Sequence, residues 1–283
     1  MPAGSREKET MRFMRRGGTS IAGAAAYVAI RLGMHMVGPG ILDPRLAIVS
    51  SIAIMMLVQL ALVVSIARLQ MKPRLTALWA LLFAVGFVGM VLLPRIGHAG
   101  SAGAEIGLAA VQDLLLMLTA AFLGCTISYV IREPNILLPA AVFAGLVDYW
   151  SVSWGPLSRI MEKKPSVVAA MSVHVPTPVP GVPGTMIGMG DFVFLALFFG
   201  VLYRFGMNVR GAFWLGYLLL TAAMLVVLGY GGALPALVPM GVAVVATNIR
   251  RFHLNRDELL ATLYVGVLLL VLLVASGVFL FRR

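Results

Sequence analysis

Nine long apolar runs constrain what this chain can fold into. Each is long enough, or nearly so, to cross the hydrocarbon core of a bilayer as a helix. Because 60% of the 283 residues are hydrophobic and only 12% are charged, a water-soluble domain could not bury this much apolar surface. The sequence therefore predicts an all-α, polytopic membrane protein with about nine transmembrane helices. The runs are 19–38, 46–68, 75–94, 104–131, 136–153, 190–207, 211–230, 234–249 and 258–281.

The positive charges lie in short clusters between these runs. A net charge of +11 could suggest a nucleic-acid partner, but this pattern is typical of loops that face anionic lipid and cytoplasm. If all nine runs span, 14 Lys and Arg lie on the side of the N-terminus and 7 on the other. We therefore expect a multi-pass protein of the cell membrane with a cytoplasmic N-terminus and no nucleic-acid partner. The single cysteine, Cys125, excludes an intramolecular disulfide.

Three of the eleven acidic residues, Asp113, Asp148 and Asp191, lie within apolar runs or at their edge, where a carboxylate is costly. Asp148 lies near the end of the fifth run and Asp191 opens the sixth, so antiparallel neighbours place both at a similar depth. By parity, Pro235-Ala236-Leu237 at the start of the eighth run reaches the same face. We expect Pro239 to interrupt that helix.

Two facing carboxylates suit acid–base chemistry on an amide. The ionised carboxylate takes a proton from water while its protonated partner donates one to the carbonyl oxygen. The chain has no HExxH motif and no GxSxG motif, which argues against a zinc protease and a rhomboid-type serine protease. A proton- or ion-coupled transporter with Asp113, Asp148 and Asp191 as its relay is the alternative. Inverted repeats would favour the transporter, and none is evident.

These motifs resemble those of the presenilins and signal peptide peptidases, a family of intramembrane aspartyl proteases. Gly188-Met189-Gly190-Asp191-Phe192 is similar to the GxGD motif of that family, and Pro235-Ala236-Leu237 to its PAL motif. Asp148 matches the first catalytic aspartate, and the segment 155–157 is similar to the presenilin sequence that follows it. The resemblance covers about 130–250.

The resemblance implies a presenilin-like bundle that hydrolyses peptide bonds within transmembrane helices of other proteins. Asp148 and Asp191 would be the catalytic pair, and no metal or other cofactor is implied. Partners would be substrate helices and the lipid bilayer, and a homo-oligomer stays open. The residues that would shape the site and hold substrate are Gly188, Gly190, Pro235, Ala236 and Leu237.

The sequence differs from the family in three respects. Val147, not tyrosine, precedes the first aspartate, four helices instead of five precede it, and an extra run follows the PAL helix. Prepilin peptidases also carry a GxGD motif, but they typically have a lysine soon after it and no PAL, whereas Phe192 follows here. We expect four parts: a flexible basic arm at 1–18, a four-helix part at 19–131, a catalytic part at 132–250, and an extra helix within 251–283.

The long connection 154–189 separates the two aspartates. We expect a short amphipathic helix over 157–171, followed by an extended, mobile chain, because four prolines between 176 and 183 disfavour helix. The resemblance to the presenilin family, and not the sequence alone, implies that the segment 174–186 pairs with an unwound substrate as an added strand.

For the other polar residues in or near the runs, we expect structural roles. We expect Asp113 and Gln112 to make an interhelical hydrogen bond or to lie at a water-exposed turn. Arg31 and His35 should snorkel or pair, and His174 should be solvated.

Overall fold

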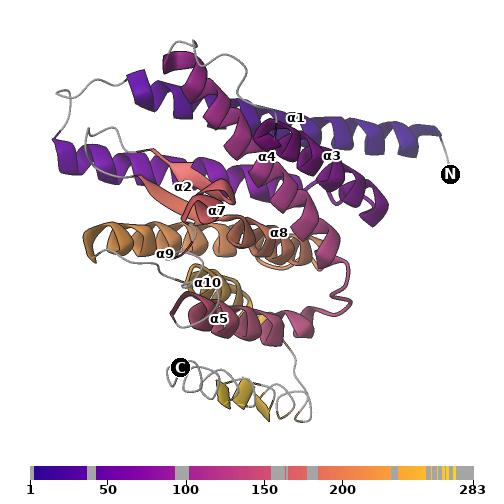
Figure 1. The fold of residues 1–283 in the computed structure, drawn as a ribbon. Helices are drawn as coiled ribbons and strands as arrows, with labels where there is room; N and C mark the ends of the chain where they lie inside the picture. Colours follow the sequence, from indigo (N-terminus) through magenta and orange to yellow (C-terminus); the bar gives the residue numbers. More distant parts are fainter. Residues whose placement is uncertain are drawn as a thin grey trace. The chain divides into compact units, whose positions relative to one another are not determined.

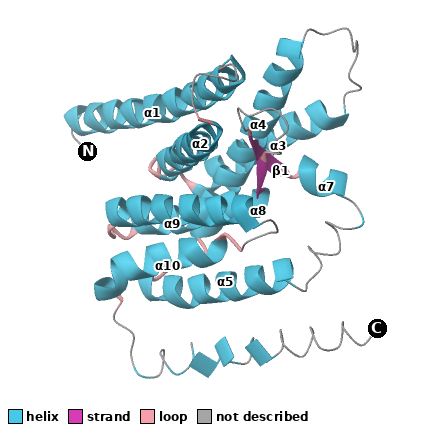
Figure 2. Cartoon of the chain, turned by 90° about the vertical axis from the view of Figure 1, so that its left-hand side faces the viewer, coloured by secondary structure: helices cyan, strands magenta, loops and turns pink. Residues whose placement is uncertain are grey.

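The computed structural model of the chain describes residues 3–36, 43–92, 102–153, 165–176, 184–230 and 235–252, with Lys163 and isolated positions between 256 and 271. Helices dominate, and the described strands form one hairpin (Figure 2). The protein is a mostly helical integral membrane protein. The elements are α1 (Ala3–Met36), α2 (Pro44–Ala67), α3 (Pro73–Leu92), α4 (Ala102–Ser128), a 3-10 turn (Pro134–Ile136), α5 (Leu137–Ser153), α7 (Pro165–Ala170), β1 (Ser172–Val175), β2 (Thr185–Gly188), α8 (Met189–Arg204), α9 (Val209–Tyr230), α10 (Leu237–Asn248) and a 3-10 turn (Ile249–Arg251).

Helices occupy eight of the nine predicted runs, and most of the ninth, 258–281, lies outside the described residues. The basic segment before the first run differs from expectation. Residues 3–18 are continuous with α1 instead of forming a flexible arm. Arg, Glu, Lys and Met in this stretch all have high helix propensity, and no proline interrupts it after Pro2.

Five described helices are long and apolar enough to cross a membrane. They are α2, α3, α4, the segment 134–152 and α9; the predicted count of nine spans is not confirmed. Two others, α8 with 16 residues and α10 with 12, extend only about 24 and 18 Å. Both are shorter than the roughly 30 Å hydrocarbon core, and both begin at one of the predicted motifs.

The chain divides into two compact units, of which unit 1 contains residues 1–129 and 171–203. In unit 1, α4 packs against α1, α2 and α3 (Figure 1). Its core side chains include Tyr27, Met55 and Met117, all fully buried. Gly124 of α4 lies so close to α8 that a Cβ there would overlap the main chain of Val193. Small residues therefore let these two helices approach closely, as membrane helices commonly do.

Unit 2 contains residues 130–170 and 204–283. In it, α10 packs against both α5 and α9. Gly241 of α10 lies against Ala141 of α5, where an added Cβ would stand 3.4 Å from the Ala141 carbonyl oxygen. The Asn248 side chain accepts a hydrogen bond of 2.7 Å from the Asn208 main chain before α9. The predicted catalytic part, 132–250, is thus divided between the two units.

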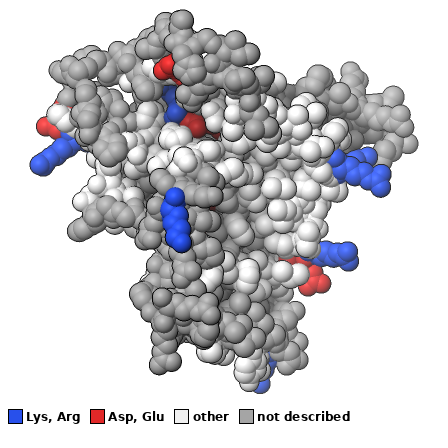
Figure 3. Space-filling model, viewed as in Figure 1, with Lys and Arg blue, Asp and Glu red and all other residues white. Residues whose placement is uncertain are grey.

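Much of the described helical surface is apolar. Large side chains of α3 such as Leu81 and Val85 are about three-fifths exposed. Charged side chains on the face shown in Figure 3 are few among the described residues. An exposed apolar surface of this extent fits contact with lipid hydrocarbon instead of water.

The long connection contains helix and strand where the structure describes it. α7 occupies part of the predicted helix at 157–171, and β1 and β2 pair antiparallel with Val173 opposite Ile187. The expectation of extended, non-helical chain is confirmed for these two strands. Residues 177–183, which carry three of the four prolines, lie outside the described residues.

The orientation of the chain can be tested at an exposed position of this connection. We predict that Ser166→Cys reacts with a membrane-impermeant maleimide in intact cells, because this segment should face outward. Lys72→Cys, which is exposed before α3, should react only after permeabilisation. The native Cys125 is buried and gives little background. Labelling of the two variants in the reverse order would overturn the predicted orientation.

Candidate active site

Asp148 and the PAL segment meet in unit 2. Asp148 lies in the second half of α5, and its Oδ2 accepts a hydrogen bond of 2.9 Å from the main-chain N–H of Leu237. Leu237 is the first residue of α10, and Ala236 before it has no side-chain acceptor. The first N–H groups of a helix lack partners within it. Asp148, which lies on α5 and 89 residues before Leu237 in the sequence, therefore caps α10.

Small residues allow this contact. Ala141, Gly145 and Asp148 lie on one face of α5, at the spacing of successive turns. A Cβ on Gly145 would stand 3.6 Å from the side chain of Val238, so the two backbones run close together. Ala141 meets Gly241 one turn further along α10. The α5 face that carries Asp148 is thus the face that packs on α10.

The two prolines of the PAL region have different consequences. Pro235 lies just outside α10, one residue before the N-cap residue Ala236, where it removes no hydrogen bond of the helix. Pro239 was expected to interrupt the helix, and that expectation is wrong. It lies in the first turn of α10, where its missing N–H would have had no partner within the helix. The first regular helical bond, Met240 N–H to Ala236 O, follows directly at 3.3 Å.

Asp191 belongs to unit 1, where it lies in the first turn of α8. The strand β2 ends at Gly188 and α8 begins at the next residue. The Met189 N–H donates to the carbonyl of Met171, 3.0 Å away, so the junction between β2 and α8 is tied to the start of β1. A carboxylate in the first turn of a helix is favoured by the helix dipole.

The glycines of the GxGD motif are not required by the described packing. Neither Gly188 nor Gly190 has a positive φ angle. A Cβ on Gly188 would stand 3.7 Å from Asp191 Oδ2, an ordinary contact, and one on Gly190 would meet no described atom within 4 Å. The predicted close approach at these glycines is therefore not made by any described residue. By contrast, Gly124 and Gly200 do lie in tight helix–helix contacts.

The structure thus assembles the predicted site residues in two groups. Asp148 lies with Leu237 and the start of α10, and Asp191 lies with Gly188 and the hairpin. Asp148 and Asp191 belong to different units, and each is described within its own unit.

Sequence reasoning missed a buried ion pair in unit 1. Arg31 of α1 and Asp113 of α4 approach to 2.7 Å, and each side chain is only 6% exposed. The predicted interhelical bond of Asp113 and the predicted pairing of Arg31 are therefore one and the same contact. Opposite charges at membrane depth on two different runs were the signal that could have identified it. The side chain of His35 lies outside the described residues.

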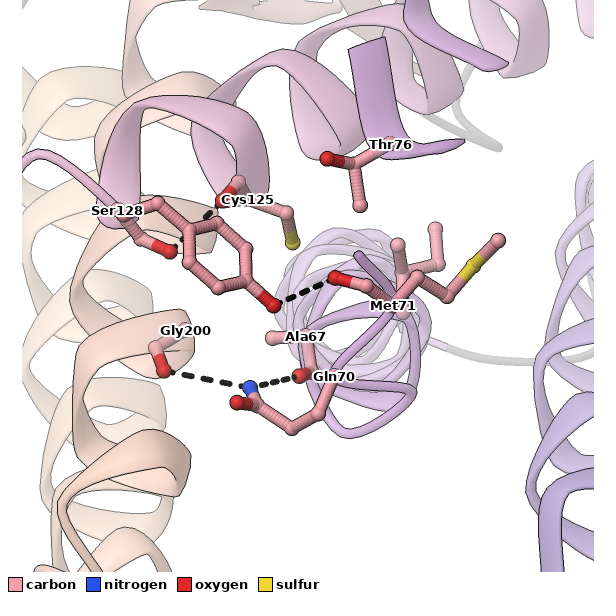
Figure 4. A pocket seen from close by; sticks show the side chains of 9 residues that line it. Ala67, Gln70, Met71, Thr76, Cys125, Ser128 and Gly200 are labelled. Atoms are coloured by element: carbon pink, nitrogen blue, oxygen red, sulfur yellow. Dashed lines mark hydrogen bonds between the residues drawn. The ribbon is translucent and has the colours of Figure 1, made fainter. Parts of the chain in front are cut away.

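A small cavity in unit 1 contains no predicted site residue. It lies where the ends of α2 and α4 approach α8, and Cys125, Ser128 and Gly200 contribute to its wall (Figure 4). Hydrogen bonds cross it: Gln70 donates to the Gly200 carbonyl at 3.3 Å, and Tyr129 donates to the Met71 carbonyl at 2.5 Å. These bonds tie helix ends together and give the cavity a packing role.

Comparison with protein families, with curated proteins and with solved structures gives no match for this chain.

The capping role of Asp148 gives a prediction about stability alone. Asp148→Ala leaves the Leu237 N–H without its acceptor and should lower the free energy of unfolding by about 1–2 kcal/mol. Asp148→Asn keeps an amide oxygen that can accept the bond and should lose much less. Thermal unfolding of both variants in the same detergent measures the difference. Equal melting of the two variants would contradict the capping role.

Proposed function

We propose that this protein is an intramembrane aspartyl protease that hydrolyses peptide bonds within transmembrane helices of membrane proteins of the cell membrane. The observation that carries the proposal is the hydrogen bond from Leu237 to Asp148. It joins two elements of the predicted motif set that lie on different helices. A polar contact of this kind between apolar helices needs a reason, because carboxylates at membrane depth are costly and usually functional.

In the proposed mechanism, Asp148 and Asp191 act on a water molecule and the scissile amide. One ionised carboxylate takes a proton from water, which attacks the carbonyl carbon. The other carboxylic acid donates its proton to the carbonyl oxygen, and the roles exchange as the amine leaves. Pro235, Ala236 and Leu237 would hold the substrate backbone beside the pair. The chemistry needs no cofactor.

The hairpin offers a place for an unwound substrate segment. In an antiparallel ladder, bonded and non-bonded pairs alternate. Because Met189 bonds to Met171, the register makes Val173–Ile187 a bonded pair and leaves the N–H and C=O of Met186 on the outer edge of β2. Met186 is half exposed, and no described residue bonds to those two groups. A substrate strand added there would lie two residues before Gly188 and five before Asp191.

The open positions at Gly188 and Gly190 support the same proposal. The described residues leave room for a Cβ at both, and in this proposal the bound chain occupies that space. Glycine allows another backbone to approach most closely. The transporter alternative gains nothing from the third aspartate, because Asp113 is neutralised by Arg31 instead of standing as a relay carboxylate.

The catalytic pair can be tested by isosteric substitution. Asp148→Asn and Asp191→Asn should each lower cleavage of a single-pass membrane peptide at least about a thousandfold, because an amide cannot exchange the proton. The double variant should be no worse than either single one, since the two groups act as a unit. The pH dependence of wild-type activity should be bell-shaped. Mass mapping of the products in detergent or liposomes measures the cut.

Glu133→Gln is the matched control, because this exposed carboxylate lies outside the proposed site. It should cleave like the wild type. Cleavage at the wild-type rate by folded Asp191→Asn protein would sink the proposed mechanism. Transport of an ion by the wild type, with no peptide product, would favour the transporter.

The glycines give a prediction that separates folding from activity. Gly188→Ala should unfold like the wild type or slightly later, because its Cβ makes only ordinary contacts. It should lower turnover by about tenfold or more if a substrate backbone approaches there. Gly107→Ala in α4, whose Cβ would meet nothing within 4 Å, is the control and should leave turnover unchanged. Full turnover by Gly188→Ala would remove the substrate contact from the proposal.

A further inference from the structure

Arg31 and Asp113, the buried ion pair of unit 1, bond to the hairpin as well as to each other. Arg31 donates from Nη1 to the main-chain carbonyl of His174 and from Nη2 to Asp113. Asp113 Oδ2 in turn accepts the main-chain N–H of His174 at 3.3 Å. Its other oxygen lies 3.4 Å from His174 Nδ1. The pair therefore holds both main-chain polar groups of a single strand residue.

These two groups lie on the outer edge of β1. The ladder register that makes Val173–Ile187 a bonded pair makes His174–Met186 a non-bonded one. The N–H and C=O of His174 therefore point away from β2, toward α1 and α4. An ordinary neighbouring strand would bond to these same groups. Arg31 and Asp113 supply the donor and the acceptor that such a strand would supply.

A third helix continues this edge. The hydroxyl of Ser51, on α2, donates a hydrogen bond of 2.7 Å to the carbonyl of Pro176. Pro176 is two residues beyond His174, so its carbonyl lies on the same outer edge. Ser51 is 3% exposed and Asp113 is 4% exposed. Side chains from α1, α2 and α4 thus close the outer edge of β1 in a region shielded from water.

The edge of β1 in turn fixes the position of the motif. β1 pairs with β2 along four residues, and β2 runs directly into α8. His174 of β1 lies opposite Met186 of β2, and Asp191 lies five residues after Met186. Because both side chains are only 6% exposed, an arrangement that separated Arg31 from Asp113 would leave an uncompensated buried charge, and the arrangement that keeps them paired is favoured.

We propose that Arg31 and Asp113 are positioning residues that stand in for a third strand, hold the β1–β2 hairpin assembled before substrate binds, and thereby place Gly188 and Asp191. The effect on catalysis rests on the proposed protease function, whereas the effect on the hairpin does not. The closed edge of β1 leaves the outer edge of β2 as the one described hairpin edge open to an added strand. Asp113 acts through β1 and has no catalytic role of its own.

The test compares hydrogen exchange and turnover in full-length protein. The double variant Arg31→Met/Asp113→Leu removes both charges and keeps apolar volume, so it avoids an unpaired buried charge. We expect amides of 172–175 and 185–188 to exchange at least about tenfold faster, because two charge-assisted bonds to β1 are lost. Exchange in the middle of α2 and α4 should stay unchanged. With a cleaved peptide as readout, kcat should fall by about tenfold or more while the pH profile keeps its shape.

Two further variants sharpen the result. Arg31→Lys keeps the charge but cannot bond to Asp113 and to the His174 carbonyl through one planar fork, so it should fall between the wild type and the double variant. Thr126→Val removes a 2.9 Å hydroxyl bond between α3 and α4 that does not involve the hairpin. As the matched control, it should change neither hairpin exchange nor kcat.

Unchanged hairpin exchange in the double variant would overturn the proposal, as would faster exchange spread evenly through α2 and α4. If hairpin exchange rises but kcat holds, the pair does not position Asp191. If the wild type cleaves no peptide, the proposed function fails, and the exchange data alone then decide whether the pair holds the hairpin.

Discussion

Polar groups within apolar helices must find their partners inside the chain, because lipid hydrocarbon offers none. This constraint accounts for the contacts on which the described arrangement depends. Asp148 bonds to the otherwise unpartnered N–H at the start of α10, and Arg31 and Asp113 bond to each other and to His174. Each contact joins elements that are distant in the sequence. The contacts that satisfy these polar groups are therefore also the contacts that fix the tertiary arrangement.

Close packing through small residues makes these contacts reachable. Gly145 and Gly241 bring α5 and α10 together in unit 2, and Gly124 and Gly200 bring α4 and α8 together in unit 1. Small residues at such crossings allow close van der Waals packing. This packing stabilises helix association in lipid, where the hydrophobic effect between helices is absent. Gly188 and Gly190 differ from these four, because among the described residues an added Cβ would make one ordinary contact at Gly188 and none within 4 Å at Gly190. That difference separates the glycines used for packing from the two that we propose lie beside a bound chain.

The proposed site combines two short helices with two different supports. α10 begins at the PAL segment and is capped by Asp148, whereas α8 begins beside a hairpin held by the buried ion pair. Helices that start within an apolar region expose unpaired main-chain groups, which are useful only if something binds or caps them. In one case the cap is a proposed catalytic carboxylate itself. In the other, the neighbouring carboxylate, Asp191, lies in the first turn.

The sequence by itself determined the helical membrane class and the positions of eight helices, because hydrophobic run length decides those features. Antiparallel parity predicted only that Asp148 and the PAL segment reach the same face, and the Leu237–Asp148 bond agrees with that prediction. Only the structure showed that Pro239 does not interrupt α10, that residues 3–18 form the first part of α1, and that Arg31 pairs with Asp113. A proline's effect depends on its position relative to a helix start, which run boundaries give only to within a few residues. The partner of a buried charge depends on how α1 and α4 are rotated about their axes, and a nearly all-apolar sequence carries no periodic pattern that fixes that rotation.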